Sequence, residues 1–156
     1  MSDPSALLDR YRKAGRRLAT AESCTGGMVA ARLTDIAGSS DVVERGFVTY
    51  SNEAKIELIG VSAELLLNYG AFSAQVARAM ADGALAHSRA DIAISITGIA
   101  GPGGAVPGKP VGLVYLALAA KGRDTRVERQ HFDGDRQAVR SAALERALEL
   151  LDSAID

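Results

Sequence analysis

Apolar residues recur at helical intervals in two segments of the chain, residues 4–14 and residues 135–155. Gly15 directly follows the first segment and is a typical helix stop. The positions with this spacing are Leu7, Leu8 and Tyr11 in the first segment and Val139, Ala143, Ala147 and Leu151 in the second. We therefore expect both segments to form amphipathic helices.

Between these segments, short apolar runs alternate with helical patterns. Strands are predicted at residues 17–21, 42–50, 91–96, 111–119 and 125–132, and helices at 25–37, 52–59, 63–68 and from the N-cap Ser73 to His87. The last two strands are adjacent in the sequence and can pair as a hairpin through Lys121 and Gly122. This order predicts one α/β domain over residues 1–156, with three layers and a mixed β-sheet flanked by helices.

Composition narrows the class of protein. The chain has 156 residues, 47% of them hydrophobic, and a formal net charge of −1, which disfavours a nucleic-acid-binding surface. Cys24 is the single cysteine and the two histidines lie far apart in sequence, so neither a disulfide nor a zinc site is expected. The polar N-terminus and the absence of a membrane-spanning apolar run favour a cytoplasmic protein.

The first candidate segment for chemistry is Ala21 to Gly27, where a predicted strand enters a helix. Ser23 at such a turn is a candidate nucleophile, because the helix N-terminus offers backbone N–H groups to a developing anion. The alternative is an ordinary serine N-cap, with glycines for close packing. A thiolate at Cys24 would also be a nucleophile, and spacing alone does not choose between the two residues.

The second segment runs from Tyr50 to Lys55, at the next junction of a strand with a helix. A serine needs a base at neutral pH, and a lysine can serve when burial lowers its pKa. A tyrosine hydroxyl can relay the proton. The alternative is an exposed helix lysine beside a half-buried tyrosine.

The third segment, residues 97–110, holds five glycines and three prolines and predicts a loop. Its glycines would let backbone amides approach a ligand, and Lys109 could supply charge for a phosphate. The segment matches neither the P-loop nor the GxGxxG pattern. A structural crossover is the alternative, although a loop of this length is more often functional.

Together these segments resemble the C-terminal domain of the CinA competence/damage-inducible protein family, which includes nicotinamide-nucleotide amidohydrolases. The resemblance rests on Glu22-Ser23-Cys24-Thr25-Gly26-Gly27, Tyr50-Ser51-Asn52-x-x-Lys55, Thr97-Gly98-Ile99-Ala100-Gly101-Pro102 and Lys109-Pro110-Val111-Gly112. Ala105 stands where another glycine is common in the family. Many members also carry a larger N-terminal domain with pyrophosphatase activity, to which nothing in this sequence corresponds, so we expect that activity to be absent.

The resemblance implies deamidation of nicotinamide mononucleotide, with Ser23 as nucleophile, Lys55 as general base and Tyr50 assisting proton transfer. It implies no cofactor and no metal, and backbone amides near Gly26 and Gly27 are our candidate oxyanion hole. Arg136 or Arg140 would hold the 5′-phosphate, which suits a bidentate guanidinium. The predicted substrate-binding residues are Thr25, Gly26, Gly27, Thr97, Gly98, Gly101, Lys109, Arg136 and Arg140.

Two other functions fit the same sequence. A non-catalytic nucleotide-binding module would use the fold and the loop, but would have no reason to combine Ser23, Tyr50 and Lys55. A hydrolase of the same mechanism acting on a different amide is the other alternative. The expected partner is a small-molecule nucleotide, with no nucleic acid and no membrane. Alanine-rich helix faces also allow a homo-oligomer.

Overall fold

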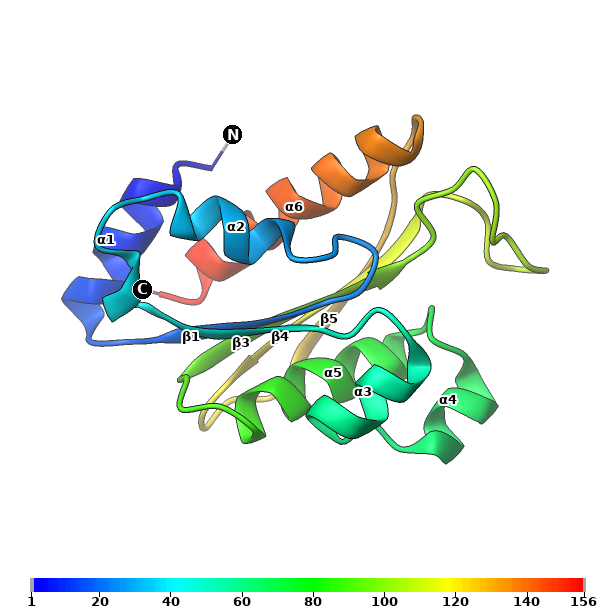
Figure 1. The fold of residues 1–156 in the computed structure, drawn as a ribbon, viewed down its shortest axis with the longest axis horizontal. Coiled ribbons are helices and arrows are strands. Elements are labelled where there is room, and N and C mark those ends of the chain that lie inside the picture. Colours follow the sequence, from blue (N-terminus) through cyan, green and yellow to red (C-terminus); the bar gives the residue numbers. More distant parts are fainter. Residues whose placement is uncertain (1, 156) are drawn as a thin grey trace.

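A mixed β-sheet forms the middle layer of the molecule in the computed structural model, which describes residues 2–155 (Figure 1). Met1 and Asp156, the ends of the predicted domain, lie outside the described residues. The five strands, in the order β2-β1-β3-β4-β5, are β2 (Val43–Val48), β1 (Leu18–Glu22), β3 (Ile92–Gly98), β4 (Leu113–Ala120) and β5 (Arg126–His131). β1 is parallel to both β2 and β3, whereas β4 pairs antiparallel with β3 and β5. The predicted mixed sheet and its hairpin are confirmed.

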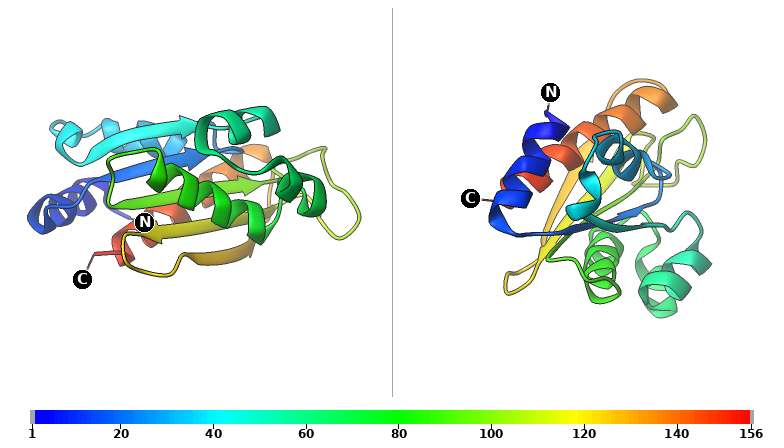
Figure 2. Two further views of the ribbon diagram at one scale, coloured as in Figure 1. Left: turned by 90° about the horizontal axis from the view of Figure 1, so that it is seen from below. Right: turned by 60° about the vertical axis from the view of Figure 1, so that its left-hand side comes forward.

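Helices cover both faces of this sheet (Figures 1 and 2). One layer contains α1 (Pro4–Ala14), α2 (Met28–Thr34) and α6 (Arg136–Ser153), and the other contains α3 (Asn52–Ile59), α4 (Ala63–Tyr69) and α5 (Ala74–Ala86). A short 3-10 helix, Ser39–Asp41, precedes β2. The three-layer α/β prediction is therefore confirmed. No helix within residues 2–155 is long and apolar enough to cross a membrane.

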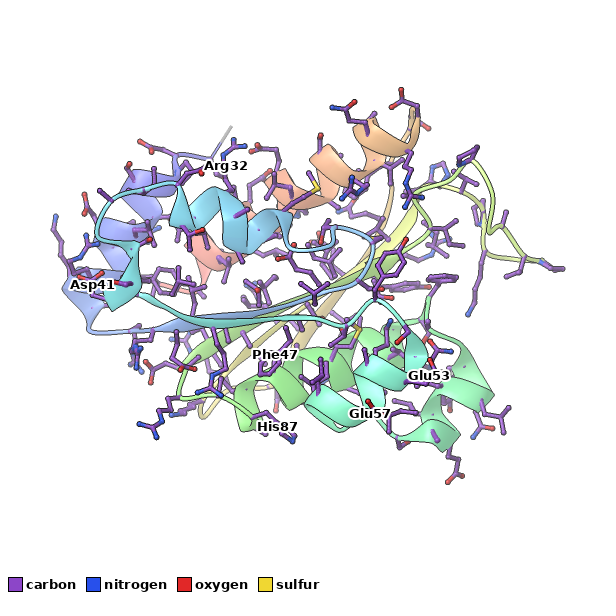
Figure 3. All side chains as sticks on the ribbon, viewed as in Figure 1. Arg32, Asp41, Phe47, Glu53, Glu57 and His87 are labelled. Carbon is purple, nitrogen blue, oxygen red and sulfur yellow. The ribbon has the colours of Figure 1, made fainter. Side chains whose placement is uncertain are left out.

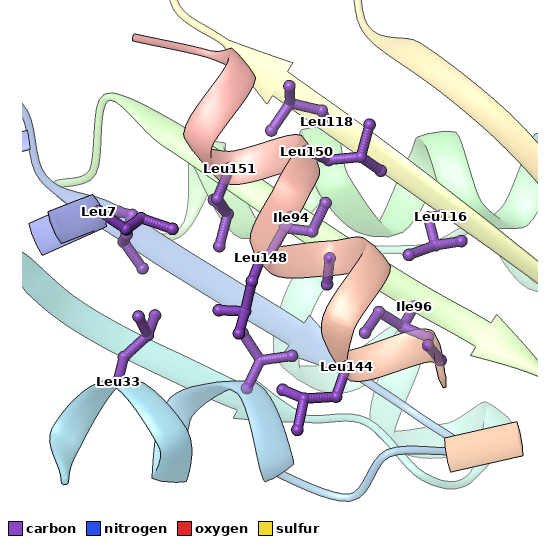
Figure 4. Close-up of a cluster of buried hydrophobic side chains, with 14 of the residues drawn as sticks. Leu7, Leu33, Ile94, Ile96, Leu116, Leu118, Leu144, Leu148, Leu150 and Leu151 are labelled. Atoms are coloured by element: carbon purple, nitrogen blue, oxygen red, sulfur yellow. The ribbon is translucent and has the colours of Figure 1, made fainter. Parts of the chain in front are cut away.

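The two faces of the central strand β3 are buried against different side chains. Large residues such as Ile94 pack with Leu148 of α6, Leu7 of α1 and Leu33 of α2 (Figure 4). On the other face, small residues such as Ala93 let α5 approach the sheet closely. Phe47 of β2 packs in that second layer, as Figure 3 shows. Burial on both faces explains why the strand is a continuous apolar run.

Local capping signals fix most helix bounds. Ser51, Ser62, Ser73 and Asp135 each accept a backbone hydrogen bond at the start of α3, α4, α5 and α6. The prediction of a helix over residues 25–37 was wrong at both ends, because α2 covers only Met28–Thr34. Gly26 and Gly27 have φ values of 59° and 108°, so the chain turns there before the helix begins.

Gly83 lets α5 pack directly against the end of α3. A Cβ atom at Gly83 would lie 2.0 Å from the carbonyl oxygen of Ile59. We expect Gly83→Ala to lower the free energy of unfolding by about 2 kcal/mol or more, because the clash outweighs the helix propensity of alanine, worth about 1 kcal/mol. Urea unfolding measures this. Gly103→Ala is the control, since an added Cβ there meets nothing within 4 Å. Equal stability of the two variants would contradict this packing.

Candidate active site

Ser23 lies directly after β1, at the edge of the sheet where the parallel strands β1, β2 and β3 all end. Its backbone N–H donates to the carbonyl of Ile96 in β3, at 3.0 Å, and its side chain is buried, with 5% of the residue exposed. Thr49 follows β2 and the glycine-rich loop follows β3 at the same edge. Ligands of open α/β sheets bind outside the carboxyl ends of strands. The topology therefore brings the three candidate segments together.

Lys55, in the first turn of α3, points from the second helical layer to Ser23. Its Nζ lies 3.1 Å from Ser23 Oγ and 2.8 Å from the carbonyl oxygen of Thr49. The carbonyl of Tyr50 is a third acceptor, at 3.4 Å from Nζ. Only 1% of the residue is exposed. The structure thus places a buried amine within hydrogen-bond reach of the serine hydroxyl.

Burial sets the protonation of this amine. Removal from water lowers the pKa of Lys55 from its ordinary value of 10.5 to about 8. The carbonyl acceptors favour the ammonium form, but the cost of burying a charge is larger. At neutral pH a usable fraction of the side chain is therefore the neutral amine that a general base requires.

The same burial acts in the opposite sense on the neighbouring thiol. Desolvation raises the pKa of Cys24 from 9.0 to about 11, so the thiol is protonated at neutral pH. Since a thiolate is the reactive form of cysteine, the alternative nucleophile is disfavoured. Cys24 contributes its backbone, whose carbonyl accepts a hydrogen bond from Arg140.

The Tyr50 side chain points away from the serine–lysine pair. Its backbone carbonyl is 3.5 Å from Ser23 Oγ, but its hydroxyl accepts a hydrogen bond from Nη2 of Arg136 at 3.2 Å. The residue is 62% exposed. The Tyr50 backbone therefore lies beside the serine–lysine pair, whereas its hydroxyl is bonded to Arg136.

A pocket of about 240 Å³ opens over Ser23. Its lining includes Cys24, Tyr50, Phe72 and Arg136, together with the glycine-rich residues Gly98, Ile99, Ala100, Gly101, Gly103 and Gly104. Gly98 and Gly101 are needed for the close approach of the chain: a Cβ atom on either would lie 2.5 Å from a neighbouring atom, the Leu113 carbonyl oxygen or Val111 Cγ1. Gly98 and Gly101, two of the four glycines predicted to bind substrate, therefore line the pocket.

Six predicted substrate-binding residues do not line this pocket: Thr25, Gly26, Gly27, Thr97, Lys109 and Arg140. Thr97 Oγ1 donates to the carbonyl of Ala71 at 2.9 Å and so holds the loop that carries Phe72. Lys109 Nζ donates to the carbonyl of Tyr69 at 2.6 Å, at the end of α4. The expectation that Lys109 supplies charge to a ligand is not supported by this placement, because α4 ends outside the pocket. Thr25 is fully buried.

Glu22, which sequence reasoning did not assign, explains the position of Thr25. Its Oε1 accepts from Thr25 Oγ1 at 2.7 Å and from the N–H of Val29 at 2.9 Å, and its Oε2 accepts from Ala30 N–H at 3.2 Å. These bonds occupy N–H groups at the start of α2 that we expected to be free. Gly26 N–H donates to the carbonyl of Ser23 at 3.0 Å, so the oxyanion-hole prediction fails for Gly26.

Two arginines of α6 face this region. Arg140 donates through Nε to the carbonyl of Cys24 at 3.0 Å and through Nη2 to that of Thr25 at 3.3 Å. Arg136 donates through Nη1 to the carbonyl of Gly101 at 2.9 Å. Both line a second hollow of about 830 Å³, which shares Ala100 and Arg136 with the pocket over Ser23. Arg136 therefore stands at the boundary between the two spaces.

Neither histidine belongs to the site. His87 lies at the end of α5, where its Nδ1 is 2.8 Å from the Gly83 carbonyl oxygen (Figure 3). His131 lies on β5, with Nε2 3.1 Å from the Val111 carbonyl oxygen. In the part of the chain that the structure describes, no group of three His, Cys, Asp or Glu residues could hold a metal ion.

Comparison with known proteins gives consistent matches. A family model described as the CinA C-terminal domain matches residues 3–155. The chain is 56% identical to a CinA-like protein of Citrifermentans bemidjiense over 151 residues, which are 97% of this chain and 36% of that protein. It is 55% identical to the nicotinamide-nucleotide amidohydrolase PncC of Escherichia coli over 137 residues, which are 88% of this chain and 83% of that protein.

Solved structures agree with these sequence matches. The competence/damage inducible protein CihA from Agrobacterium tumefaciens superposes with a TM-score of 0.93 at 47% identity, covering 96% of this chain and 92% of that chain. A CinA superfamily protein from Escherichia coli superposes with a TM-score of 0.92 at 40% identity, covering 96% and 87%. This chain spans about a third of the length of the curated CinA-like relatives that it matches.

The lowered pKa of Lys55 predicts a pH dependence of stability. Between pH 8 and pH 10.5 the unfolded chain binds a proton at Lys55 that the folded chain does not, so the free energy of unfolding rises with pH. The variant Lys55→Met has no amine to titrate, so its free energy of unfolding lacks this contribution to the pH dependence. From pH 7.5 to 9.5 we expect the wild type to gain of the order of 1–2 kcal/mol relative to the variant in urea unfolding. Parallel pH profiles for the two proteins would show that Lys55 is not perturbed.

Proposed function

We propose that this chain, which belongs to the CinA C-terminal domain family, is a serine amidohydrolase acting on nicotinamide mononucleotide. It converts the carboxamide and water into nicotinic acid mononucleotide and ammonia. The observation that carries the proposal is the buried contact of 3.1 Å between Lys55 Nζ and Ser23 Oγ. The substrate is supported by the 55% identity to a nicotinamide-nucleotide amidohydrolase.

The first half of the reaction forms an acyl-enzyme. Neutral Lys55 takes the proton of the Ser23 hydroxyl as Oγ bonds to the carboxamide carbon, and the carbonyl π electrons move onto its oxygen. When the tetrahedral intermediate collapses, the C–N bond breaks and the Lys55 ammonium gives its proton to the leaving nitrogen, which departs as ammonia. The nicotinoyl group is left as an ester on Ser23.

The second half regenerates the serine. Neutral Lys55 takes a proton from water as the water oxygen bonds to the ester carbon, and collapse breaks the bond to Ser23 Oγ. Oγ recovers its proton from Lys55, and nicotinic acid mononucleotide leaves. No step needs a charged nucleophile in the resting enzyme, which suits a buried pair.

The two hollows provide room for the two ends of the substrate. The pocket over Ser23, with Phe72 and the glycine-rich loop, takes the pyridine ring. The larger hollow beyond Arg136 takes the ribose 5′-phosphate, because Arg136 supplies positive charge at its boundary. A purely nucleotide-binding module would gain nothing from a buried lysine beside a serine, since burying an amine costs stability.

Removal of either member of the pair should abolish turnover. We expect Ser23→Ala and Lys55→Met to lower kcat for ammonia release by about a thousandfold or more, as in other enzymes whose nucleophile and base act as a unit. Cys24→Ala is the matched control and should stay within a few fold of the wild type. Circular dichroism verifies folding. Full activity of Ser23→Ala with an inactive Cys24→Ala would transfer the nucleophile to the thiol.

A separate measurement tests the substrate class. If the wild-type protein binds nicotinamide mononucleotide in calorimetry but releases no ammonia, the protein is a nucleotide-binding module and the amidohydrolase function is refuted for this substrate. Release of ammonia from other amides and not from this nucleotide would keep the mechanism and change the substrate.

The rate should also follow the protonation of Lys55. Because the neutral amine is the active form and the pKa of Lys55 is about 8, kcat/KM should rise with pH up to about that value and then level off. Initial rates from pH 6 to 9.5 measure this. A flat profile across this range would exclude Lys55 as the base.

A further inference from the structure

The hydrogen bond between Tyr50 and Arg136 lies across the boundary of the two hollows. Arg136 begins α6 and donates to Tyr50 Oη at 3.2 Å and to the Gly101 carbonyl at 2.9 Å. It thereby connects the segment after β2 to the loop after β3. While this bond exists, the Tyr50 hydroxyl is engaged away from the serine–lysine pair.

The Tyr50 backbone is nevertheless close to that pair. Its carbonyl oxygen is 3.4 Å from Lys55 Nζ, so the side chain begins beside the reacting groups. Since Tyr50 is 62% exposed, close packing does not lock its rotamer, and exposed side chains change rotamer rapidly. Tyr50 and Ser23 line the same pocket, so the space into which the phenol can turn lies over the serine.

Arg136 has only neutral acceptors. Among residues 2–155, no carboxylate forms an ion pair with it, although the carboxylate of Asp135 lines the same hollow. Asp135 Oδ1 is engaged in capping α6 through the N–H of Ala138, at 2.9 Å. A phosphate carries negative charge and can accept two parallel hydrogen bonds from a guanidinium, whereas the phenol oxygen is a single neutral acceptor. A phosphate in the hollow would therefore displace the phenol as a partner of Arg136.

Arg140 differs in what it holds. Its two hydrogen bonds go to the carbonyls of Cys24 and Thr25, in the turn that follows the nucleophile. A ligand that captured Arg140 would release that turn and disturb Ser23. Capture of Arg136 releases only Tyr50 and the Gly101 carbonyl.

We propose that Arg136 is a phosphate-responsive latch: the 5′-phosphate of the substrate binds its guanidinium and frees the Tyr50 hydroxyl to turn toward Ser23 and Lys55. Arg140 is a positioning residue that holds the nucleophile turn. This inference rests on the proposed amidohydrolase function. It makes the phosphate a requirement for catalysis and not only for affinity, because part of its binding energy is used to assemble the site.

The test compares nicotinamide mononucleotide with nicotinamide riboside, which has the same carboxamide and no phosphate. In the wild type, kcat for the riboside should be lower than that for the nucleotide by about fivefold or more, the usual scale of coupling between two sites. Inorganic phosphite or phosphate, added in trans, should raise riboside turnover.

Arg136→Met separates the latch from a simple phosphate anchor. The variant should raise KM for the nucleotide, because the phosphate loses its partner, and raise kcat for the riboside by about threefold or more, because the phenol is no longer restrained. Phosphite should have no effect on it. In the double variant Arg136→Met/Tyr50→Phe the gain on the riboside should disappear. Arg140→Met is the matched control and should lower kcat for both substrates by the same factor.

Each contrary result has a distinct meaning. If Arg136→Met raises KM for the nucleotide but leaves riboside turnover at the wild-type level, Arg136 is only an anchor and the latch is overturned. If Arg140→Met harms the nucleotide alone, the phosphate belongs to Arg140. Wild-type protein that deamidates neither substrate would refute the proposed function itself, whereas equal kcat values for both substrates would refute only the latch.

Discussion

The reactivity proposed for the contact between the Lys55 amine and Ser23 depends on the removal of that amine from water. Lys55 reaches Ser23 because α3 begins just after β2, and because β1 and β2 are parallel and end at one edge. The carbonyls of Thr49 and Tyr50 orient the amine without neutralising it. These acceptors stabilise the ammonium, so the lowered pKa shows that desolvation is the larger effect.

The opposite helical layer holds the nucleophile. Glu22 points into that layer and joins the end of β1 to the first N–H groups of α2. Arg140 reaches the next two carbonyls of the turn from α6. A carboxylate and a guanidinium thus fix the segment around Ser23 from the side away from Lys55. Ser23 follows a strand of the sheet, so the turn that carries it is held from one helical layer and Lys55 reaches it from the other.

Local patterns predicted the elements well and the side-chain partners poorly. The period of apolar residues predicted α6 to within two residues, the N-cap Ser73 predicted the start of α5, and α3 was predicted without error. The start of α2 was missed because two left-handed glycines outweigh the helical pattern after Thr25. That Ser23 and Lys55 act together was implied by the family resemblance, whereas the parallel pairing of β1 and β2 that brings them together was not predicted. The partners of Glu22, Arg136 and Lys109 could not, since they depend on tertiary placement and leave no periodic signal.

Burial also favours the proposed pair of an alcohol and an amine over the thiol of Cys24, which lies next in the sequence. One environment lowers the pKa of Lys55 to about 8 and raises that of Cys24 to about 11, because burial disfavours the charged form of each. A thiolate–ammonium pair needs both charges in the resting state, which this site opposes. A hydroxyl and a neutral amine carry none until the proton moves. In a buried site the free-energy cost of separating charge then arises only at the transition state, where hydrogen-bond donors fixed by the fold can offset it.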